Sequence, residues 1–251
     1  MEREVKNGVV KSQNCIAPDV YHMVIEEKTV AKSAKVGQFI NIYPKQKHIL
    51  LPRPISISEI DESSITIVYS VVGQGTAEFA TYNAGDEIKI STALGSGFVP
   101  QDVKTHILVG GGIGVPPLVE LAKQVSGEKI AVLGFRDEPF LKERLEELGV
   151  KVFVATDSGN FGFKGNVVEL IKSENIVGDY YYSCGPKPML KALSEHCEQI
   201  NKPLQVSLEE RMGCGYGACV GCVCKIKTEE TISRKKVCKD GPVFLSSEVV
   251  W

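Results

Sequence analysis

Four cysteines near the C-terminus constrain this chain more than any other feature. Three of them, Cys214, Cys219 and Cys222, are separated by four and then two residues, and Cys238 follows further along the sequence. This C-x4-C-x2-C spacing with a distant fourth cysteine is typical of a plant-type two-iron, two-sulfur cluster. Iron of formal positive charge prefers soft, anionic sulfur ligands. The sequence therefore predicts a 2Fe-2S cluster held by these four thiolates.

The loop between these cysteines is rich in glycine. Gly213, Gly215, Gly217 and Gly221 lie between or beside the first three cysteines. Because glycine has no Cβ, it adopts positive φ readily and lets backbone N–H groups approach the sulfur atoms. We therefore expect a loop that wraps the cluster closely.

Zinc binding and disulfide formation are the two alternatives for these cysteines. Structural zinc sites usually show two C-x2-C-like pairs, which the x4 gap and the glycines fit poorly. Disulfides are disfavoured because no hydrophobic signal segment precedes the body of the chain, so we expect a reducing cytoplasm. Cys224 does not match the ligand spacing and is left out of the set. Cys15 and Cys197 are expected to be half-buried thiols without a role.

Length and composition set the outer limits. The chain has 251 residues, of which 43% are hydrophobic and 24% are charged, so it is long enough for more than one core. A net charge of -2 gives no basic surface for nucleic acid. No run of about 18 apolar residues predicts a membrane span. We expect three parts, covering residues 1–98, 99–205 and 206–251.

The first part shows short β-rich stretches punctuated by glycine and proline. Ile65, Ile67 and Tyr69 fall on one side of an extended chain, and a short helix is expected over Thr76–Tyr82. This pattern predicts a small antiparallel barrel. Its expected strands are Val5–Val10, Tyr21–Glu26, Gln38–Tyr43, Ile65–Val72 and Glu87–Ile90.

In the second part, strands and helices alternate, which predicts a parallel, doubly wound sheet. One helix is expected to end near Gln124 and another to cover Phe140–Leu148. The expected strands are Thr105–Val109, Ile130–Phe135, Lys151–Thr156 and Tyr180–Cys184.

Two motifs of the first part are suited to phosphate. Arg53 offers a planar, permanently charged fork, and Ser56 offers a hydroxyl beside backbone that Pro54 stiffens. Gly75 and Thr76, at the start of the expected helix, would present free N–H groups to a pyrophosphate. Together they predict a site for a phosphate-bearing cofactor on the barrel.

The second part carries a glycine run, residues 110–114, that leads from a strand into a helix beginning with proline. It does not satisfy G-x-G-x-x-G, but a glycine-rich strand-to-helix turn suits a dinucleotide phosphate. The turns at residues 156–159 and 184–186 end other strands, at the edge where open parallel sheets bind ligands. Arg136 suits a 2′-phosphate and Asp137 a 2′-hydroxyl, so NAD and NADP both remain open.

Together, the three parts predict a chain of electron carriers. A cluster of this type passes one electron at a time, a nicotinamide exchanges a two-electron hydride, and a flavin does both. The four histidines are scattered and no site for an organic substrate is apparent, which suggests that another subunit holds the substrate chemistry. The cluster part is too small for a sizeable core, so we expect its fold to depend on the metal and on a partner surface.

Arg-Pro-Ile-Ser followed by Gly-x-Gly-Thr resembles the flavin-binding barrel of the ferredoxin-NADP reductase superfamily, and Cys-Gly-Pro resembles a turn of its nicotinamide domain. The resemblance implies that Cys184 lies near the nicotinamide, where it is the candidate catalytic residue. It implies FAD at Arg53, Pro54, Ile55, Ser56, Val68, Tyr69, Ser70, Gly75 and Thr76. The residues expected to meet NAD, a diffusible acceptor, are Gly111, Gly112, Ile113, Gly114, Asp157, Cys184, Gly185 and Pro186.

The cysteine segment, read with these motifs in their order, resembles the electron transfer subunits of B-type dihydroorotate dehydrogenases over nearly the whole chain. This resemblance implies FAD, a 2Fe-2S cluster and an FMN-bearing catalytic partner in a heterotetramer of two plus two. Electrons would pass from dihydroorotate to FMN, then to the cluster, FAD and NAD+, in pyrimidine synthesis.

Two alternatives stay open. One is the flavin and iron-sulfur subunit of a ferredoxin-dependent NADP reductase or sulfide dehydrogenase, whose members often carry an acidic residue where this chain has Cys214. The other is a non-enzymatic, zinc-bearing interaction module.

Overall fold

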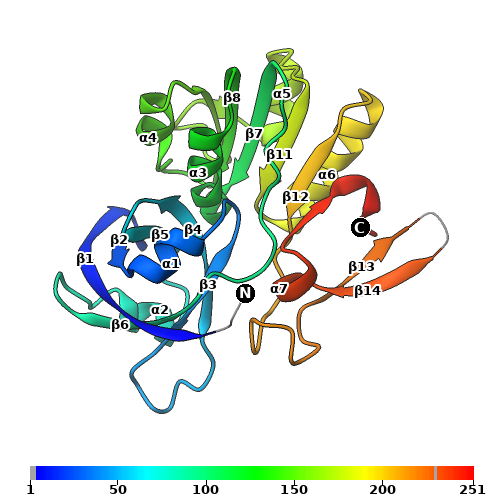
Figure 1. The fold of residues 1–251 in the computed structure, drawn as a ribbon. Coiled ribbons are helices and arrows are strands. Elements are labelled where there is room, and N and C mark those ends of the chain that lie inside the picture. The colour runs from blue at the N-terminus through cyan, green and yellow to red at the C-terminus, as the bar shows by residue number, and fades with distance from the viewer. Residues whose placement is uncertain (1–3, 229–230) are drawn as a thin grey trace.

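The computed structural model describes residues 4–228 and 231–251. Figure 1 shows three regions: a barrel in blue and cyan, a sheet flanked by helices in green and yellow, and a C-terminal segment in orange and red. Within the described residues, no helix is both long and apolar enough to cross a membrane.

The first region is a closed antiparallel barrel with strand order β1-β2-β5-β4-β3-β6. Inward-facing Ile40, Ile42, Ile65 and Ile67 are fully buried in its core, as the period of two predicts. The predicted barrel is therefore confirmed. Its elements are β1 (Val5–Ala17), β2 (Val20–Glu26), α1 (Lys28–Ser33), β3 (Phe39–Tyr43), β4 (Arg53–Ile60), β5 (Ser64–Ser70), α2 (Gln74–Phe79) and β6 (Glu87–Ser91).

Three barrel elements differ from expectation. β1 runs to Ala17 because it stays paired with β2 through two irregularities in register. β4 was not expected as a strand, yet its Pro54 pairs with Asn41 in an antiparallel ladder. The helix α2 begins two residues early, at Gln74.

The second region contains a seven-stranded sheet in the order β10-β9-β8-β7-β11-β12-β15. All of its strands are parallel except β15, which is antiparallel to β12. The predicted parallel sheet is confirmed, with a further strand supplied by the C-terminal segment. The strands are β7 (Thr105–Gly111), β8 (Glu128–Phe135), β9 (Lys151–Thr156), β10 (Phe163–Lys164), β11 (Tyr180–Cys184), β12 (Leu204–Ser207) and β15 (Val243–Leu245).

Helices cover both faces of this sheet. Helices α3 (Pro116–Gln124) and α4 (Lys142–Glu147) share a core with Leu108 and Leu133, to which Val68 of the barrel also belongs. On the other face, α5 (Val167–Ser173) and α6 (Lys187–Gln199) pack over Val109 and Val132. The helix α4 starts later than expected because Leu141 takes a left-handed φ of 63°.

The C-terminal segment does not form a separate core. Cys222, Val237 and Phe244 are buried in the same cluster as Leu190 and Val206 of the second region. The boundary expected at residue 205 falls inside β12, and β15 joins the sheet beyond it. The segment holds β13 (Val223–Lys227), β14 (Ile232–Lys236), α7 (Val237–Asp240) and a short 3-10 turn, Ser246–Glu248. A second 3-10 turn, Gly112–Gly114, follows β7 in the second region. Its dependence on metal and partner stays a prediction.

Candidate functional site

The predicted flavin motif lies on the accessible part of β4. Arg53, Pro54, Ile55 and Ser56 are all half-buried, whereas the next three residues of the strand are buried. The Arg53 side chain lies across Gly75, because a Cβ at Gly75 would sit 2.7 Å from its Nε atom. The structure therefore brings the two predicted phosphate motifs together, and the guanidinium packs directly on the backbone of Gly75.

Strand β5 contributes in a different way from its neighbour. Tyr69 is 1% exposed, and its hydroxyl donates to Oε1 of Gln13 at 2.8 Å inside the barrel. Val68 is buried on the other side, in the core shared with α3. Ser70 is half-buried at the end of the strand. A ligand can therefore contact the backbone of β5 and Ser70, whereas the side chains of Val68 and Tyr69 are not accessible to it.

The glycine turn after β7 packs directly on the turn after β11. A Cβ at Gly114 would lie 2.3 Å from the Cys184 carbonyl oxygen, and one at Gly111 would lie 2.9 Å from Cδ of Pro186. Gly185 has a φ of +155° at the same contact. The predicted nicotinamide residues of these two strands thus meet at adjacent carboxyl ends of the sheet.

The N-terminus of α3 has fewer free backbone N–H donors than most helices. Pro116 and Pro117 have no N–H, and the Val115 N–H donates to the Gly112 carbonyl at 3.1 Å. The region around Gly112, which has a φ of +52°, is open, because a Cβ there would meet nothing within 4 Å. The backbone of the short 3-10 turn, rather than α3 itself, is therefore the part that suits a pyrophosphate.

A polar cluster lies beyond β8 and β9. Oδ1 of Asp137 accepts from Oγ of Ser158 at 2.6 Å and from Nδ2 of Asn160 at 3.1 Å. These bonds hold the pKa of Asp137 below its usual range, so the carboxylate stays charged at neutral pH. Asp157 lies in the same turn, with its N–H bonded to the Phe135 carbonyl at 3.2 Å. A fixed negative charge here suits a ribose hydroxyl better than a phosphate.

All three regions line one cavity of about 260 Å³. Pro54 and Ser56 come from the barrel, Cys184 from the end of β11, and Glu209 and Met212 from the segment that leads into the cysteine loop. Sequence reasoning missed Glu209 and Met212, which form part of the stretch just before the first cluster cysteine. The predicted flavin and nicotinamide motifs therefore face each other beside that loop.

Two ionisable groups that line this cavity, Cys184 and Glu209, have raised pKa values. Burial, and then the charge of Glu209, raise the pKa of the Cys184 thiol to about 12. Burial also raises the pKa of Glu209, although this residue is exposed to solvent. Cys184 is therefore a neutral thiol at physiological pH, suited to packing against a ring and not to nucleophilic attack.

The four predicted cluster cysteines gather as two pairs. The Cys219 N–H donates to Sγ of Cys214 at 3.4 Å, and the two thiols also contact each other. Burial, and then the neighbouring Cys222 side chain, raise the pKa of Cys238 to about 12. Although burial acts to raise it, backbone N–H groups lower the pKa of Cys214 to about 6. A cysteine that is already largely a thiolate is suited to binding metal.

This arrangement fits a two-iron cluster better than a single ion. Two pairs of thiols match a cluster in which each iron takes two cysteines. Gly215 and Gly217 have φ of +76° and +87°, which confirms the expected positive φ at two of the four loop glycines. The donor set of four cysteines in two pairs therefore fits a 2Fe-2S cluster.

The other cysteines are separate from these pairs. Cys224 is buried in β13. The expectation that Cys15 and Cys197 are half-buried is wrong for both: Cys15 faces solvent from β1, and Cys197 is 1% exposed on the inner side of α6.

These burial differences predict an order of alkylation. Treatment of the cofactor-loaded protein with iodoacetamide should label Cys15 first, because only its thiol among Cys15, Cys184 and Cys197 is exposed. Burial also raises the pKa of Cys197 to about 12, which suppresses the reactive thiolate. Peptide mass spectrometry over time would measure the order. Labelling of Cys184 as fast as Cys15 would contradict the packing of the cavity.

Comparisons with known proteins agree with this geometry. Residues 209–250 match the iron-sulfur cluster binding domain of dihydroorotate dehydrogenase B. A solved NADH-dependent reduced ferredoxin-NADP oxidoreductase is similar in fold, with a TM-score of 0.87 and 27% identity over 97% of this chain and 90% of that one. A ferredoxin-NADP+ reductase from Plasmodium falciparum shares the fold, with a TM-score of 0.62 and 16% identity over 76% of this chain and 89% of that one.

Two curated relatives are more similar in sequence, and both are named dihydroorotate dehydrogenase B (NAD(+)), electron transfer subunit. The one from Caldanaerobacter subterraneus subsp. tengcongensis is 43% identical over 96% of this chain and 97% of its own length. The one from Geobacillus kaustophilus is 44% identical over 96% of each. The chain therefore belongs to the family of dihydroorotate dehydrogenase B electron transfer subunits.

Proposed function

We propose that this chain is the electron transfer subunit of a dihydroorotate dehydrogenase. It passes electrons from a catalytic partner subunit through a 2Fe-2S cluster and FAD to NAD+, in the synthesis of UMP. The observation that carries this proposal is the cavity in which Ser56, Cys184 and Glu209 meet, since it joins a flavin strand, a nicotinamide turn and the cysteine segment. When bound, the flavin supplies the conversion between single electrons and a hydride.

The residues of this chain hold and orient those groups. Arg53 and the Gly75 loop are placed to hold the FAD pyrophosphate. Cys214, Cys219, Cys222 and Cys238 are the proposed ligands of the cluster. The turn after β7 and the Cys184–Pro186 turn would carry the nicotinamide nucleotide across the carboxyl edge of the sheet.

The side chain at Cys184 would keep water from the transfer site. Its thiol is 2% exposed and lines the same cavity as Ser56. A neutral thiol beside a hydroxyl offers a small, weakly polar wall. Cys184 is the proposed residue in contact with the nicotinamide.

The partner is proposed to carry FMN and to form a complex of two copies of each chain. Exposed apolar side chains on the cysteine loop support a docking surface there: Val220 is 73% exposed and Tyr216 is 42% exposed. We also place the protein in the cytoplasm, because none of its eight cysteines forms a disulfide, as is usual in a reducing compartment.

The division of labour gives a direct test. The isolated chain, loaded with FAD and cluster, should oxidise NADH with an artificial dye but should not turn over dihydroorotate, because the substrate chemistry lies on the partner. Both rates can be followed by absorbance in the same preparation. Addition of the partner, co-purified from the native host, should restore dihydroorotate-to-NAD+ transfer. Dihydroorotate oxidation by the pure chain would show the proposed division to be wrong.

A further inference from the structure

Asn41 occupies an unusual place for a polar side chain. It lies in the middle of β3, where Ile40 and Ile42 on either side point into the barrel, so its own side chain points outward. Only 1% of it is exposed. Its ladder partner across to β4 is Pro54, inside the flavin motif. The outward face of β3 at this position is therefore covered, and what covers it is the cysteine loop.

Two contacts join Asn41 to that loop. Its Nδ2 donates to the Cys214 carbonyl oxygen at 2.9 Å. The next residue, Gly215, has a φ of +76°, and a Cβ there would lie 2.6 Å from Oδ1 of Asn41. The loop thus approaches the barrel so closely at Gly215 that only a residue without a side chain fits.

The backbone of Asn41 is also held, by a residue of the neighbouring strand β6. The Asn41 N–H donates to Oγ of Ser91 at 2.9 Å, which fixes the backbone of β3 against β6. Its Oδ1 is buried, with no hydrogen-bond partner among the described residues. A buried amide that leaves one acceptor unpaired costs free energy. Burying Asn41 so that it can bond to Cys214 therefore lowers the stability of the fold. We take this cost as a sign that the bond has a functional role.

We propose that Asn41 is a positioning residue that fixes the first cluster cysteine against the flavin-binding strand. This inference rests on the proposed function and adds one element to it. Nδ2 of Asn41 donates to the backbone carbonyl of Cys214, and the neighbour of Asn41 in the β ladder is Pro54. Asn41 therefore sets the separation and orientation between the cluster loop and the flavin site.

The test compares Asn41→Leu with the unaltered chain, both loaded with FAD and cluster. Leucine keeps the volume but cannot donate to the Cys214 carbonyl. Stopped-flow absorbance would measure how fast NADH reduces the cluster, and the EPR spectrum of the dithionite-reduced cluster would report its surroundings. We expect cluster reduction to slow by about tenfold or more and the EPR line shape to change. NADH-to-dye activity should persist, because it uses the flavin and nicotinamide sites.

A second variant acts from the other side of the contact. Gly215→Ala places a Cβ against the Asn41 amide without altering the barrel, so it should slow cluster reduction in the same way. Ser96→Ala is the matched control, since it removes a different barrel contact to the same segment, the 3.4 Å bond to the Asp240 carbonyl. Ser96→Ala should reduce its cluster at the unaltered rate.

The outcomes separate the two proposals. The inference would be overturned if Asn41→Leu reduced its cluster at the unaltered rate and kept an unchanged EPR spectrum. If Asn41→Leu does not fold, the same result in Gly215→Ala would overturn it. Either result would leave the proposed function intact. An unaltered chain that binds no FAD or no cluster would instead overturn the proposed function.

Discussion

Replacement of Cys219 by serine should abolish electron transfer between the partner subunit and this chain while leaving NADH-to-dye activity. Serine offers a hard oxygen in place of the soft thiolate that iron prefers. It also removes the thiol that contacts Cys214. The flavin and nicotinamide motifs lie on β4 and at the ends of β7 and β11, outside the cysteine loop. Transfer from the partner, iron content and acid-labile sulfide would be measured on one preparation.

The control for this loss is another cysteine. Cys15→Ser alters an exposed thiol on β1, far from the pairs in sequence, and should leave iron content and transfer unchanged. Cys224→Ser tests the limits of the ligand set, because Cys224 is buried in β13 only two residues beyond Cys222. Unimpaired transfer in Cys219→Ser would remove Cys219 from the set. Loss of iron in Cys224→Ser would add Cys224 to it.

Local patterns in the sequence were enough to predict the main architecture. The alternation of Ile65, Ile67 and Tyr69 predicts a strand of the barrel, and the structure confirms that these side chains point inward. The parallel sheet is likewise predicted by strands that alternate with helices. Both patterns depend on residues close together in the chain, where spacing decides which side chains share a face.

Some missed elements also carried a local signal. Helix α5 begins with a capping box in which Asn166 accepts from the Glu169 N–H and the Glu169 side chain accepts from the Asn166 N–H. The sequence Asn-Val-Val-Glu could have predicted this helix start. Helix α6 follows Pro186 and buries Leu190, Leu193 and Cys197 at spacings of three and four.

Other features depend on contacts between distant parts of the chain. β15 reaches the sheet by pairing with β12, and Asn41 meets Cys214 from 173 residues away. The spacing of residues in the sequence does not predict such a contact, because the two partners come together only when the chain between them has folded. The same limit explains why sequence reasoning did not find the polar network between the barrel and the second region.

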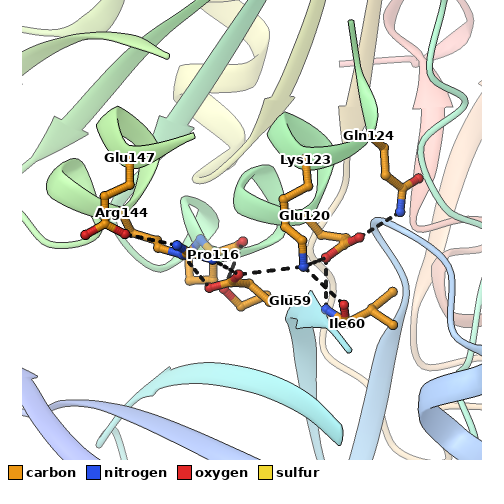
Figure 2. Close-up of polar contacts among 9 residues, drawn as sticks. Glu59, Ile60, Pro116, Glu120, Lys123, Gln124, Arg144 and Glu147 are labelled. Carbon is orange, nitrogen blue, oxygen red and sulfur yellow. Dashed lines mark hydrogen bonds and ion pairs between the residues drawn. The ribbon is translucent and has the colours of Figure 1, made fainter. Parts of the chain in front are cut away.

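That network centres on Glu59, at the buried end of β4 (Figure 2). Arg144 of α4 donates to both Glu59 carboxylate oxygens, at 3.0 and 2.7 Å. Lys123 of α3 lies 3.8 Å from Glu59 and 3.0 Å from Glu120. Oε2 of Glu120 in turn accepts from the Ile60 N–H at 2.9 Å. Two helices of the second region are thus bound to one strand of the barrel.

The placement of this network relates it to electron transfer. β4 begins with the flavin motif and ends at Glu59 and Ile60, and α3 begins directly after the glycine turn. Between them, Oγ of Ser58 donates to the Pro116 carbonyl at 3.2 Å. The same two elements that would carry flavin and nicotinamide are therefore fixed to each other. Because hydride transfer requires close, aligned rings, this network should set the angle between them.

Replacement of Arg144 by methionine should loosen that arrangement. It leaves the Glu59 carboxylate, whose side chain is only 12% exposed, with Lys123 at 3.8 Å as its remaining cation. Loss of a charged partner at a largely buried group costs about 1–3 kcal/mol, and the 39% exposure of Arg144 places the expected loss in the lower part of that range. Thermal unfolding should shift down, and flavin reduction by NADH should slow although FAD content is unchanged.

Lys142→Met is the matched control, because it removes an ion pair of the same helix that does not reach the barrel. Nζ of Lys142 lies 2.8 Å from Glu146, and both side chains are substantially exposed, so its loss should cost well under about 1 kcal/mol. Stopped-flow reduction by NADH, measured for both variants at low and high salt, distinguishes the two sites. Equal rates in the two variants would mean that Arg144 stabilises the fold without setting the geometry of hydride transfer. A selective slowing in Arg144→Met would show that the domain contact, and not only the cofactor motifs, determines how flavin and nicotinamide meet.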